Sequence, residues 1–164
     1  MNLMRAIFIV LVLIISLFCC NCAKDGEVVK KDDYYVESDF NNRYRFCEDV
    51  VLVVEGTFRL EALPDSFNVI ITNASENAYM RLGSPILERM IDDTWYTFSL
   101  QGTNDIGYYL DRFQCAEIKI GIECYREYIT VGLYRIIGLI SQASSEYDYS
   151  GTTYMIGCEF YIEA

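Results

Sequence analysis

Short runs of β-branched and aromatic residues, separated by turn residues, follow one another from residue 49 to the end of the chain. Runs of this kind are typical of β-strands. The pattern predicts seven strands, at residues 50–55, 57–60, 67–72, 94–100, 116–124, 128–139 and 153–162. Because many short strands with turns between them favour a sandwich or a barrel, we predict an all-β, two-sheet antiparallel β-sandwich.

Apolar and charged residues alternate within residues 116–124. This alternation predicts a strand with one buried face and one face in water. Cys115 and Cys124 would fall on opposite faces of a regular strand. A bulge at Gly121 would bring both cysteines to the same side.

Two segments carry helical features, so one or two short helices are expected beside the strands. The serine–proline pair at residues 84–85 offers a cap and a first helical position for a turn or two at residues 86–90. Residues 103–113 place apolar side chains at i, i+3, i+4 and i+7. A short strand at residues 108–110 is the alternative, because Gly107 weakens a helix.

The first 22 residues have the organisation of a secretory signal peptide. Arg5 precedes an apolar run at residues 7–18, and Cys20 and Cys22 place small side chains before the expected cleavage point. The run is short of the about 20 apolar residues that a membrane span needs. We therefore expect a secreted, extracellular protein without stable membrane insertion; an uncleaved anchor and a lipoprotein are the alternatives.

Removal of residues 1–22 leaves a polar, acidic N-terminal arm at residues 23–46 and a single domain at residues 47–164. The arm has no apolar periodicity up to residue 42, so it is expected to be extended or mobile.

The mature chain carries 12 basic and 24 acidic residues, a net charge of −12. Such a charge argues against nucleic acid or an anionic membrane as a partner and favours a basic protein, held by a contact that salt weakens. Solubility alone is the alternative explanation.

Four cysteines remain after cleavage: Cys47, Cys115, Cys124 and Cys158. An even number in a secreted chain predicts two disulfides that brace the fold. A strand between Cys115 and Cys124 separates their Cα atoms by roughly 30 Å, beyond the ~7 Å limit for a bridge. Each is therefore predicted to join Cys47 or Cys158. Metal binding is not favoured, because no C-x-x-C pair and no histidine occur.

The absence of histidine removes serine and cysteine triads, imidazole acid–base catalysis and histidine-ligated metals. Asp92 with Asp93, or Glu117 with Glu123, could serve as the carboxylate pair of a glycosidase. Such acids are usually solvated surface. We therefore predict that the protein is not an enzyme and needs no cofactor.

Fourteen tyrosines stand out, and several lie among acids at residues 32–37 and 146–149. Phenols give rigid contact area and carboxylates pair with basic side chains, so these segments are candidate contacts for a basic protein. Ordinary polar loops are the alternative, and tyrosine sulfation is a further hypothesis. With the wet face of the strand at residues 116–124, the predicted ligand contacts are Asp32, Asp33, Tyr34, Tyr35, Glu37, Glu117, Lys119, Glu123, Glu146, Tyr147, Asp148 and Tyr149.

Asn73-Ala74-Ser75 is a glycosylation sequon, expected in an exposed loop after the strand that ends at residue 72. Trp95, the single tryptophan, is predicted to be a core residue rather than a surface anchor.

Residues 103–124, with their threonine-capped acidic stretch and a strand between Cys115 and Cys124, resemble the secreted poxvirus immune-evasion β-sandwiches. This family includes the chemokine-binding proteins and the SECRET domains of viral tumour-necrosis-factor receptors. Its strand has seven residues between the cysteines, whereas this chain has eight. The resemblance implies a viral virulence factor that neutralises host chemokines. Binding of a host membrane immune molecule, such as an antigen-presenting or receptor protein, is the alternative.

Overall fold

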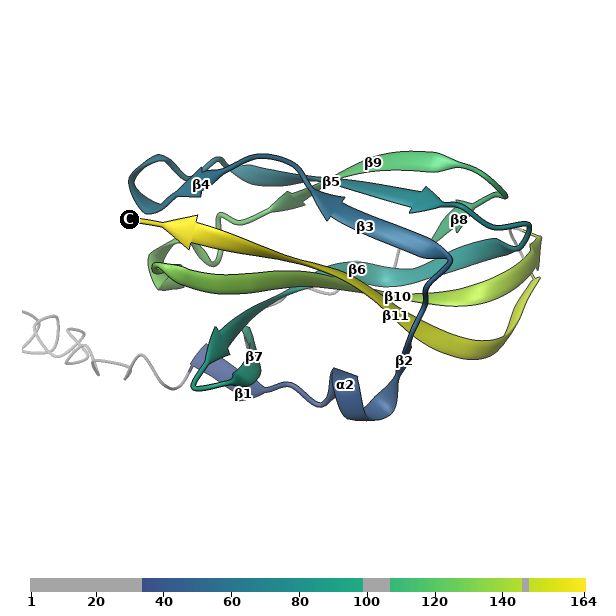
Figure 1. The fold of residues 1–164 in the computed structure, drawn as a ribbon, viewed down its shortest axis with the longest axis horizontal. Helices are drawn as coiled ribbons and strands as arrows, with labels where there is room; N and C mark the ends of the chain where they lie inside the picture. Colours follow the sequence, from purple (N-terminus) through teal and green to yellow (C-terminus); the bar gives the residue numbers. More distant parts are fainter. Residues whose placement is uncertain (1–33, 99–106, 146–147) are drawn as a thin grey trace, which may run out of the picture. The chain divides into compact units, whose positions relative to one another are not determined.

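The computed structural model describes residues 34–98, 107–145 and 148–164. This part of the chain forms two β-sheets, one above the other in Figure 1. The predicted signal peptide lies outside the described residues. No helix within the described ranges is long and apolar enough to cross a membrane.

The strands account for most of the described residues. They are β1 (Tyr35–Glu37), β2 (Arg45–Phe46), β3 (Val50–Val54), β4 (Phe58–Arg59), β5 (Ser66–Asn73), β6 (Ala78–Ile91), β7 (Thr94–Phe98), β8 (Tyr108–Leu110), β9 (Cys115–Gly121), β10 (Gly132–Ser145) and β11 (Asp148–Glu163). The short helical turns are α2 (Phe40–Arg43), η3 (Leu60–Ala62) and η4 (Arg126–Tyr128). Each of the seven predicted strands is present, although several bounds differ.

The larger sheet has eight strands in the order β1-β7-β6-β10-β11-β2, with β8 paired to β6 and β4 paired to β11. The smaller sheet has the order β3-β5-β9. All pairings are antiparallel except those of β11 with β2 and β4. The predicted all-β, two-sheet architecture is therefore confirmed.

The core lies between the two sheets, because strands of the smaller sheet alternate buried and exposed side chains. In β5, Phe67, Val69 and Ile71 are buried and the residues between them are partly exposed. The ring of Phe67 packs edge-on against Phe58 and Phe160, with centroids 4.7 and 5.0 Å away. The larger sheet contributes Leu87, Phe98, Tyr134, Ile136, Ile140, Ile156 and Ile162 to the same cluster.

The helix predicted at residues 86–90 is wrong, because these residues lie in β6, the strand next to β10. Pairing moves from Ile137 opposite Ile86 to Leu139 opposite Leu82, so four steps in β6 face two in β10. Pro85 lies in this irregular stretch. A central strand tolerates proline only where the ladder is broken, so the bulge takes the place of the helix start that the sequence suggested.

The second predicted helix is partly outside the described residues, which resume at residue 107. Tyr108–Leu110 form β8, paired with Tyr79–Arg81 of β6. The alternative prediction of a short strand here is therefore correct.

Residues 34–46, predicted to belong to an extended or mobile arm, contain β1, α2 and β2. β1 is the edge strand beside β7, and β2 pairs with β11. A side chain of α2 also contacts the larger sheet, because Asn41 Oδ1 accepts a hydrogen bond from Arg135 Nη1 at 2.9 Å.

The predicted disulfide bracing is not seen, because all four cysteines of the described part are free thiols. Cys47 is buried in the core, whereas Cys115 and Cys124 are exposed. The register of β9 with β5 is also continuous, so the expected bulge at Gly121 is absent. Cys115 lies on the outer face of β9, beside the Thr72 hydroxyl at 3.6 Å, and therefore faces away from the core that holds Cys47.

Candidate ligand-binding surface

The outer face of the smaller sheet is a grid of side chains fixed by strand register. One row across the sheet is Val53, Ile70 and Glu117. The next row ends in Asn68 and Lys119, and Glu55 begins it, because the Glu55 amide donates to the Asn68 carbonyl at 3.0 Å. Directly opposed residues of neighbouring strands share one face. Two predicted contacts, Glu117 and Lys119, are thus brought together on this face, which we call the outer grid.

The β3 edge of the outer grid is apolar and exposed. Val51 and Val53 of β3 are 49% and 44% exposed, and Val51 lies one row beyond Val53, opposite Thr72. Glu55 continues the same edge, and Glu117 and Lys119 lie on β9 at the opposite edge of the face; all three are exposed and charged. Protein-binding surfaces commonly combine apolar area with polar and charged surroundings.

Glu123, the third predicted contact near β9, lies beyond the end of that strand. It is exposed, two residues after Gly121. Its position in the turn that follows β9 places it at the border of the outer grid rather than within a row.

The first acid–tyrosine segment attaches the chain to the sheet instead of standing free. Asp32 and Asp33 lie outside the described residues, and Glu37 is exposed. The Tyr35 hydroxyl donates to the Tyr128 carbonyl at 2.9 Å and accepts from Arg89 Nη1 at 3.3 Å.

Tyr34 and Tyr128 form an aromatic pair beside this attachment, with ring centroids 3.9 Å apart. A hydrogen bond with Tyr34 raises the pKa of Tyr128 to about 12. Both tyrosines of the first segment are therefore half-buried and engaged within the chain.

The second acid–tyrosine segment lies at the far end of the larger sheet. Glu146, Tyr147 and the side chain of Tyr149 lie outside the described residues, and Asp148 is exposed and accepts from the Ser144 hydroxyl at 2.6 Å. Asp148 pairs with Ser145 at the hairpin end of β10.

The two acid–tyrosine segments do not form one patch. The row that contains Val36 of β1 runs through Thr97 and Glu88 to Arg135 of β10. Along β10, Ser145 then lies ten steps from Arg135, which corresponds to roughly 30 Å along the strand. The described parts of the two segments, residues 34–37 and Asp148, therefore do not adjoin, and their role as ligand contacts stays a prediction.

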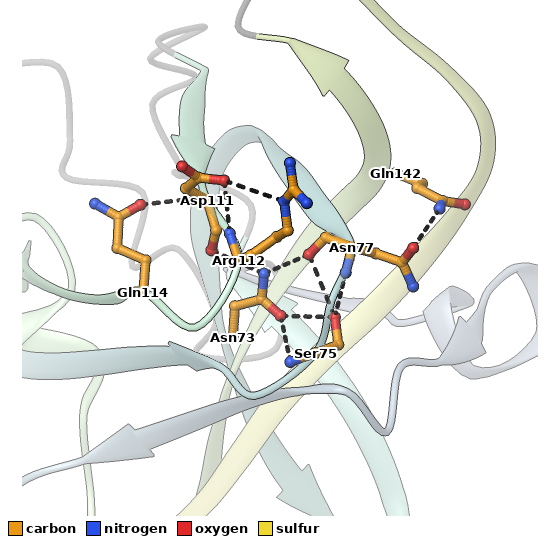
Figure 2. A network of polar contacts seen from close by, with 7 residues as sticks. All are labelled: Asn73, Ser75, Asn77, Asp111, Arg112, Gln114 and Gln142. Atoms are coloured by element: carbon orange, nitrogen blue, oxygen red, sulfur yellow. Dashed lines mark hydrogen bonds and ion pairs between the residues drawn. The ribbon is translucent and has the colours of Figure 1, made fainter.

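Asn73, the predicted glycosylation site, is fully buried at 0% exposure. Figure 2 shows its side chain at the centre of a polar network. Nδ2 donates to the carbonyls of Asn77 at 2.7 Å and Asp111 at 2.9 Å, and Oδ1 accepts from the amide and hydroxyl of Ser75. The prediction of an exposed loop is wrong, because Asn73 is the last residue of β5 and both its amide hydrogens are used inside the fold.

The same network fixes the turn between β8 and β9 (Figure 2). The backbone N–H of Asp111 donates to Gln114 Oε1 at 2.7 Å, and the backbone N–H of Asn73 donates to the backbone carbonyl of Gln114 at 2.9 Å. Asn73 therefore links the end of β5 to this turn, which presents the exposed ring of Phe113.

A buried ion pair lies on the larger sheet, between Glu88 of β6 and Arg135 of β10. Arg135 Nε donates to Glu88 Oε2 at 2.5 Å, and the Thr97 hydroxyl donates to Glu88 Oε1 at 3.0 Å. The guanidinium stacks over Trp95, 4.3 Å from the ring centroid. Trp95 is buried, as predicted.

Sequence reasoning missed this ion pair, although one indication was present. Arg135 interrupts the apolar run of residues 133–140, and a charge inside such a run needs a buried partner. The partner could not be identified, because Glu88 was assigned to a helix.

Asp92 and Asp93 form the two-residue turn between β6 and β7, with φ of 47° and 61°. Two positive φ values are typical of a type I′ hairpin turn, in which aspartate is a preferred residue. The turn therefore gives these two adjacent aspartates a structural role. Within the described ranges, no group of three or more histidine, cysteine, aspartate or glutamate side chains could hold a metal ion.

Comparisons with known proteins give no family. No family model matches the chain, and no curated protein matches it. The chain is similar to a solved β-glucosidase from Kluyveromyces marxianus, at 12% identity and a TM-score of 0.31, over 70% of this chain and 14% of that one. It is also similar to a protein from Archaeoglobus fulgidus, at 10% identity and a TM-score of 0.29, over 71% and 98% of the two chains.

Proposed function

We propose that this protein is a secreted immune modulator that captures a basic host protein, and that chemokines are the first candidates. The observation that supports the proposal is the outer grid, where the exposed valines of β3 share one sheet face with the charged residues Glu55, Glu117 and Lys119. The resemblance to the poxvirus immune-evasion β-sandwiches supplies the class of ligand.

Both parts of the outer grid have a physical role in this proposal. Covering Val51 and Val53 removes apolar area from water, at about 25 cal/mol per Å². The net charge of −12 on the mature chain attracts a basic partner over longer distances and raises the association rate. Contact strength thus comes from the valines, and steering comes from the charge.

The test is a binding screen of the secreted protein against a chemokine panel at low and high salt. We expect at least one chemokine to bind, with an association rate that falls at least tenfold as salt rises, because screening removes the steering. A Val51→Ser, Val53→Ser double variant should bind at least tenfold more weakly. The matched control is Val131→Ser, which alters an exposed valine outside the outer grid.

A host membrane immune molecule is the second candidate, because the exposed valines offer contact area that salt does not weaken. Binding to such a molecule with little salt dependence, together with silence across the chemokine panel, would favour it over the first candidate. Equal affinity of the double variant and the wild type for any captured ligand would contradict the outer grid as the contact.

A further inference from the structure

β9 forms one edge of the smaller sheet, and no described strand pairs with its outer side. It has seven residues, no proline and an unbroken register with β5. Edge strands are usually shortened, bulged, charged or interrupted by proline, because their unpaired backbone groups favour pairing with another strand. Among the described residues, the protection that β9 carries is charge, at Glu117 and Lys119. A strand that pairs with this edge must therefore match these two charges.

Hydrogen bonds at the two ends of the β5–β9 ladder determine which backbone groups of β9 face outwards. The Asn73 N–H donates to the carbonyl of Gln114 at 2.9 Å, and the Ile122 N–H donates to the carbonyl of Asp65 at 3.0 Å. Hydrogen-bonded pairs alternate with non-hydrogen-bonded pairs in an antiparallel ladder, so the even-numbered residues of β9 direct their backbone groups towards β5. The odd-numbered residues direct theirs towards the free edge, and all of them are exposed: Cys115, Glu117, Lys119 and Gly121.

This phase restricts how a second copy of β9 could pair with the first. Two edge strands related by a two-fold axis run antiparallel, and their hydrogen bonds require an odd-numbered residue opposite an odd-numbered one. Glu117 opposite its own copy, or Lys119 opposite its own copy, would oppose like charges, which is destabilising. The register between these two places Glu117 of each copy opposite Lys119 of the other. It also aligns the whole strand, with Cys115 opposite Gly121, whereas more distant registers pair fewer residues.

The inner face of β9 fits the same register. Ile118 would lie opposite Ile118 of the second copy, and its side chain is only partly buried in the monomer. Side chains approach each other most closely in a non-hydrogen-bonded pair, so the two isoleucines would cover each other. The end of the strand is open as well, because a Cβ atom at Gly121 would have no neighbour within 4 Å.

We propose that two copies of this chain associate through β9 in this register, so that their smaller sheets become one continuous antiparallel sheet. Backbone hydrogen bonds between the edges hold the dimer, and the two Glu117–Lys119 pairs select the register. Directly opposed residues share one face, so the outer grids of both copies lie on the same side of the joined sheet. This inference goes beyond the proposed function. Its test needs no ligand, so its failure would leave the proposed ligand capture unaffected.

Sedimentation equilibrium of the full secreted protein, over a series of concentrations, tests the proposal. The net charge of −12 repels a second copy at long range, so the measurement is made at 0.15 M salt, where the screening length is about 8 Å. We expect the mass to rise with concentration from one chain to two. Glu117→Lys and Lys119→Glu should each raise the dissociation constant of the dimer at least tenfold, because each creates two like-charge pairs.

Two recoveries distinguish lost charge pairing from damage to the strand. The double variant Glu117→Lys, Lys119→Glu restores opposite charges and should dimerise like the wild type. An equimolar mixture of the two single variants should form a mixed dimer, because the lysines of one chain then lie opposite the glutamates of the other. Circular dichroism checks that each variant keeps its sheets.

Glu55→Lys is the matched control, because it makes the same change in charge on the β3 edge of the outer grid. It should dimerise at least as tightly as the wild type, since it lowers the net negative charge away from β9. A wild type that is monomeric at every concentration would overturn the proposal and leave the edge to a strand of another protein. Weakening by Glu55→Lys equal to that by Glu117→Lys, or no recovery in the double variant and the mixture, would overturn it too.

Discussion

Glu88 has the most demanding environment of the residues described. Its carboxylate is 0% exposed and accepts hydrogen bonds from Arg135 and Thr97. Glu88→Ala would leave the guanidinium buried without its counter-charge, and this should lower the free energy of unfolding by about 3–5 kcal/mol. Urea denaturation of the purified variant measures the loss.

The double variant Glu88→Leu, Arg135→Met is the control for this prediction. It removes both charges together, so it should recover most of the stability that Glu88→Ala loses. A double variant as unstable as the single one would show that the loss comes from packing rather than from an unpaired charge.

The cysteines lead to a prediction about thiol labelling. Cys115 and Cys124 are exposed and Cys47 is buried. In the native protein without reductant, iodoacetamide should modify the first two within minutes and Cys47 only after unfolding, because the thiol must reach solvent to react. Peptide mass spectrometry identifies the labelled positions. Labelling of Cys115 and Cys124 only after addition of a reductant would restore the disulfides predicted from the sequence.

At the scale of elements, the sequence predicts strands well where one face meets water. The alternation in β5 and β9 follows directly from the period of two, and both strands are present. Prediction from alternation fails for β6, because this strand lies between β7 and β10 and lacks a clear alternation of buried and exposed residues. Pro85 resembled a helix start, and only the pairing with β10 shows that it lies in a bulge.

The turn between β6 and β7 offers a test of backbone strain. Asp93 has a φ of 61°, a region that glycine enters without steric cost. Asp93→Gly should therefore raise the free energy of unfolding by about 0.5–1 kcal/mol, as judged by thermal and urea denaturation. The control Glu76→Gly alters an exposed acid whose φ is not positive, and it should not stabilise the protein. Destabilisation by Asp93→Gly would contradict the assigned turn.

For the whole molecule, the architecture was predictable but the arrangement of the contact residues was not. Two sheets follow from many short strands. That residues 34–37 and Asp148 lie far apart follows only from the order and register of the strands, because Val36 of β1 shares a row with Glu88 and Arg135, ten steps along β10 from the Ser145 that pairs with Asp148. The contacts that α2 makes with Arg135 and that β2 makes with β11 could likewise not be predicted, because the sequence placed these residues in a polar arm.

Buried tyrosines should make the stability depend on alkaline pH. Burial raises the pKa of Tyr79, Tyr125 and Tyr134 above the ordinary value of 10.0. Because the pKa of these tyrosines is higher in the folded state, their contribution to the free energy of unfolding is fully present below pH 10. This contribution is lost as the pH rises above 10, where the tyrosines of the unfolded chain ionise first. In urea denaturation between pH 8 and 11, the free energy of unfolding should be constant up to about pH 10 and should fall above it.

Tyr134→Phe tests the origin of this dependence. The variant loses the two hydrogen bonds between the Tyr134 hydroxyl and Thr130, so it should be less stable at pH 8. It should nevertheless lose less stability between pH 9 and 11 than the wild type, because one ionising group has been removed. An identical slope in both proteins would assign the alkaline loss to other groups.

The hydrogen bonds of the Asn73 side chain also bear on how this chain would fold during its biosynthesis. If the chain is exported as proposed, its sequon passes the glycosylation machinery before β5 and β6 have closed around it. A sugar at Nδ2 would replace one of its two hydrogens, so this nitrogen could no longer donate to the carbonyls of both Asn77 and Asp111, and the sugar would have to fit at a position that is 0% exposed. Sugar-bearing molecules would then accumulate among the misfolded ones, and the sequon would act as a hazard of biosynthesis rather than as a modification site.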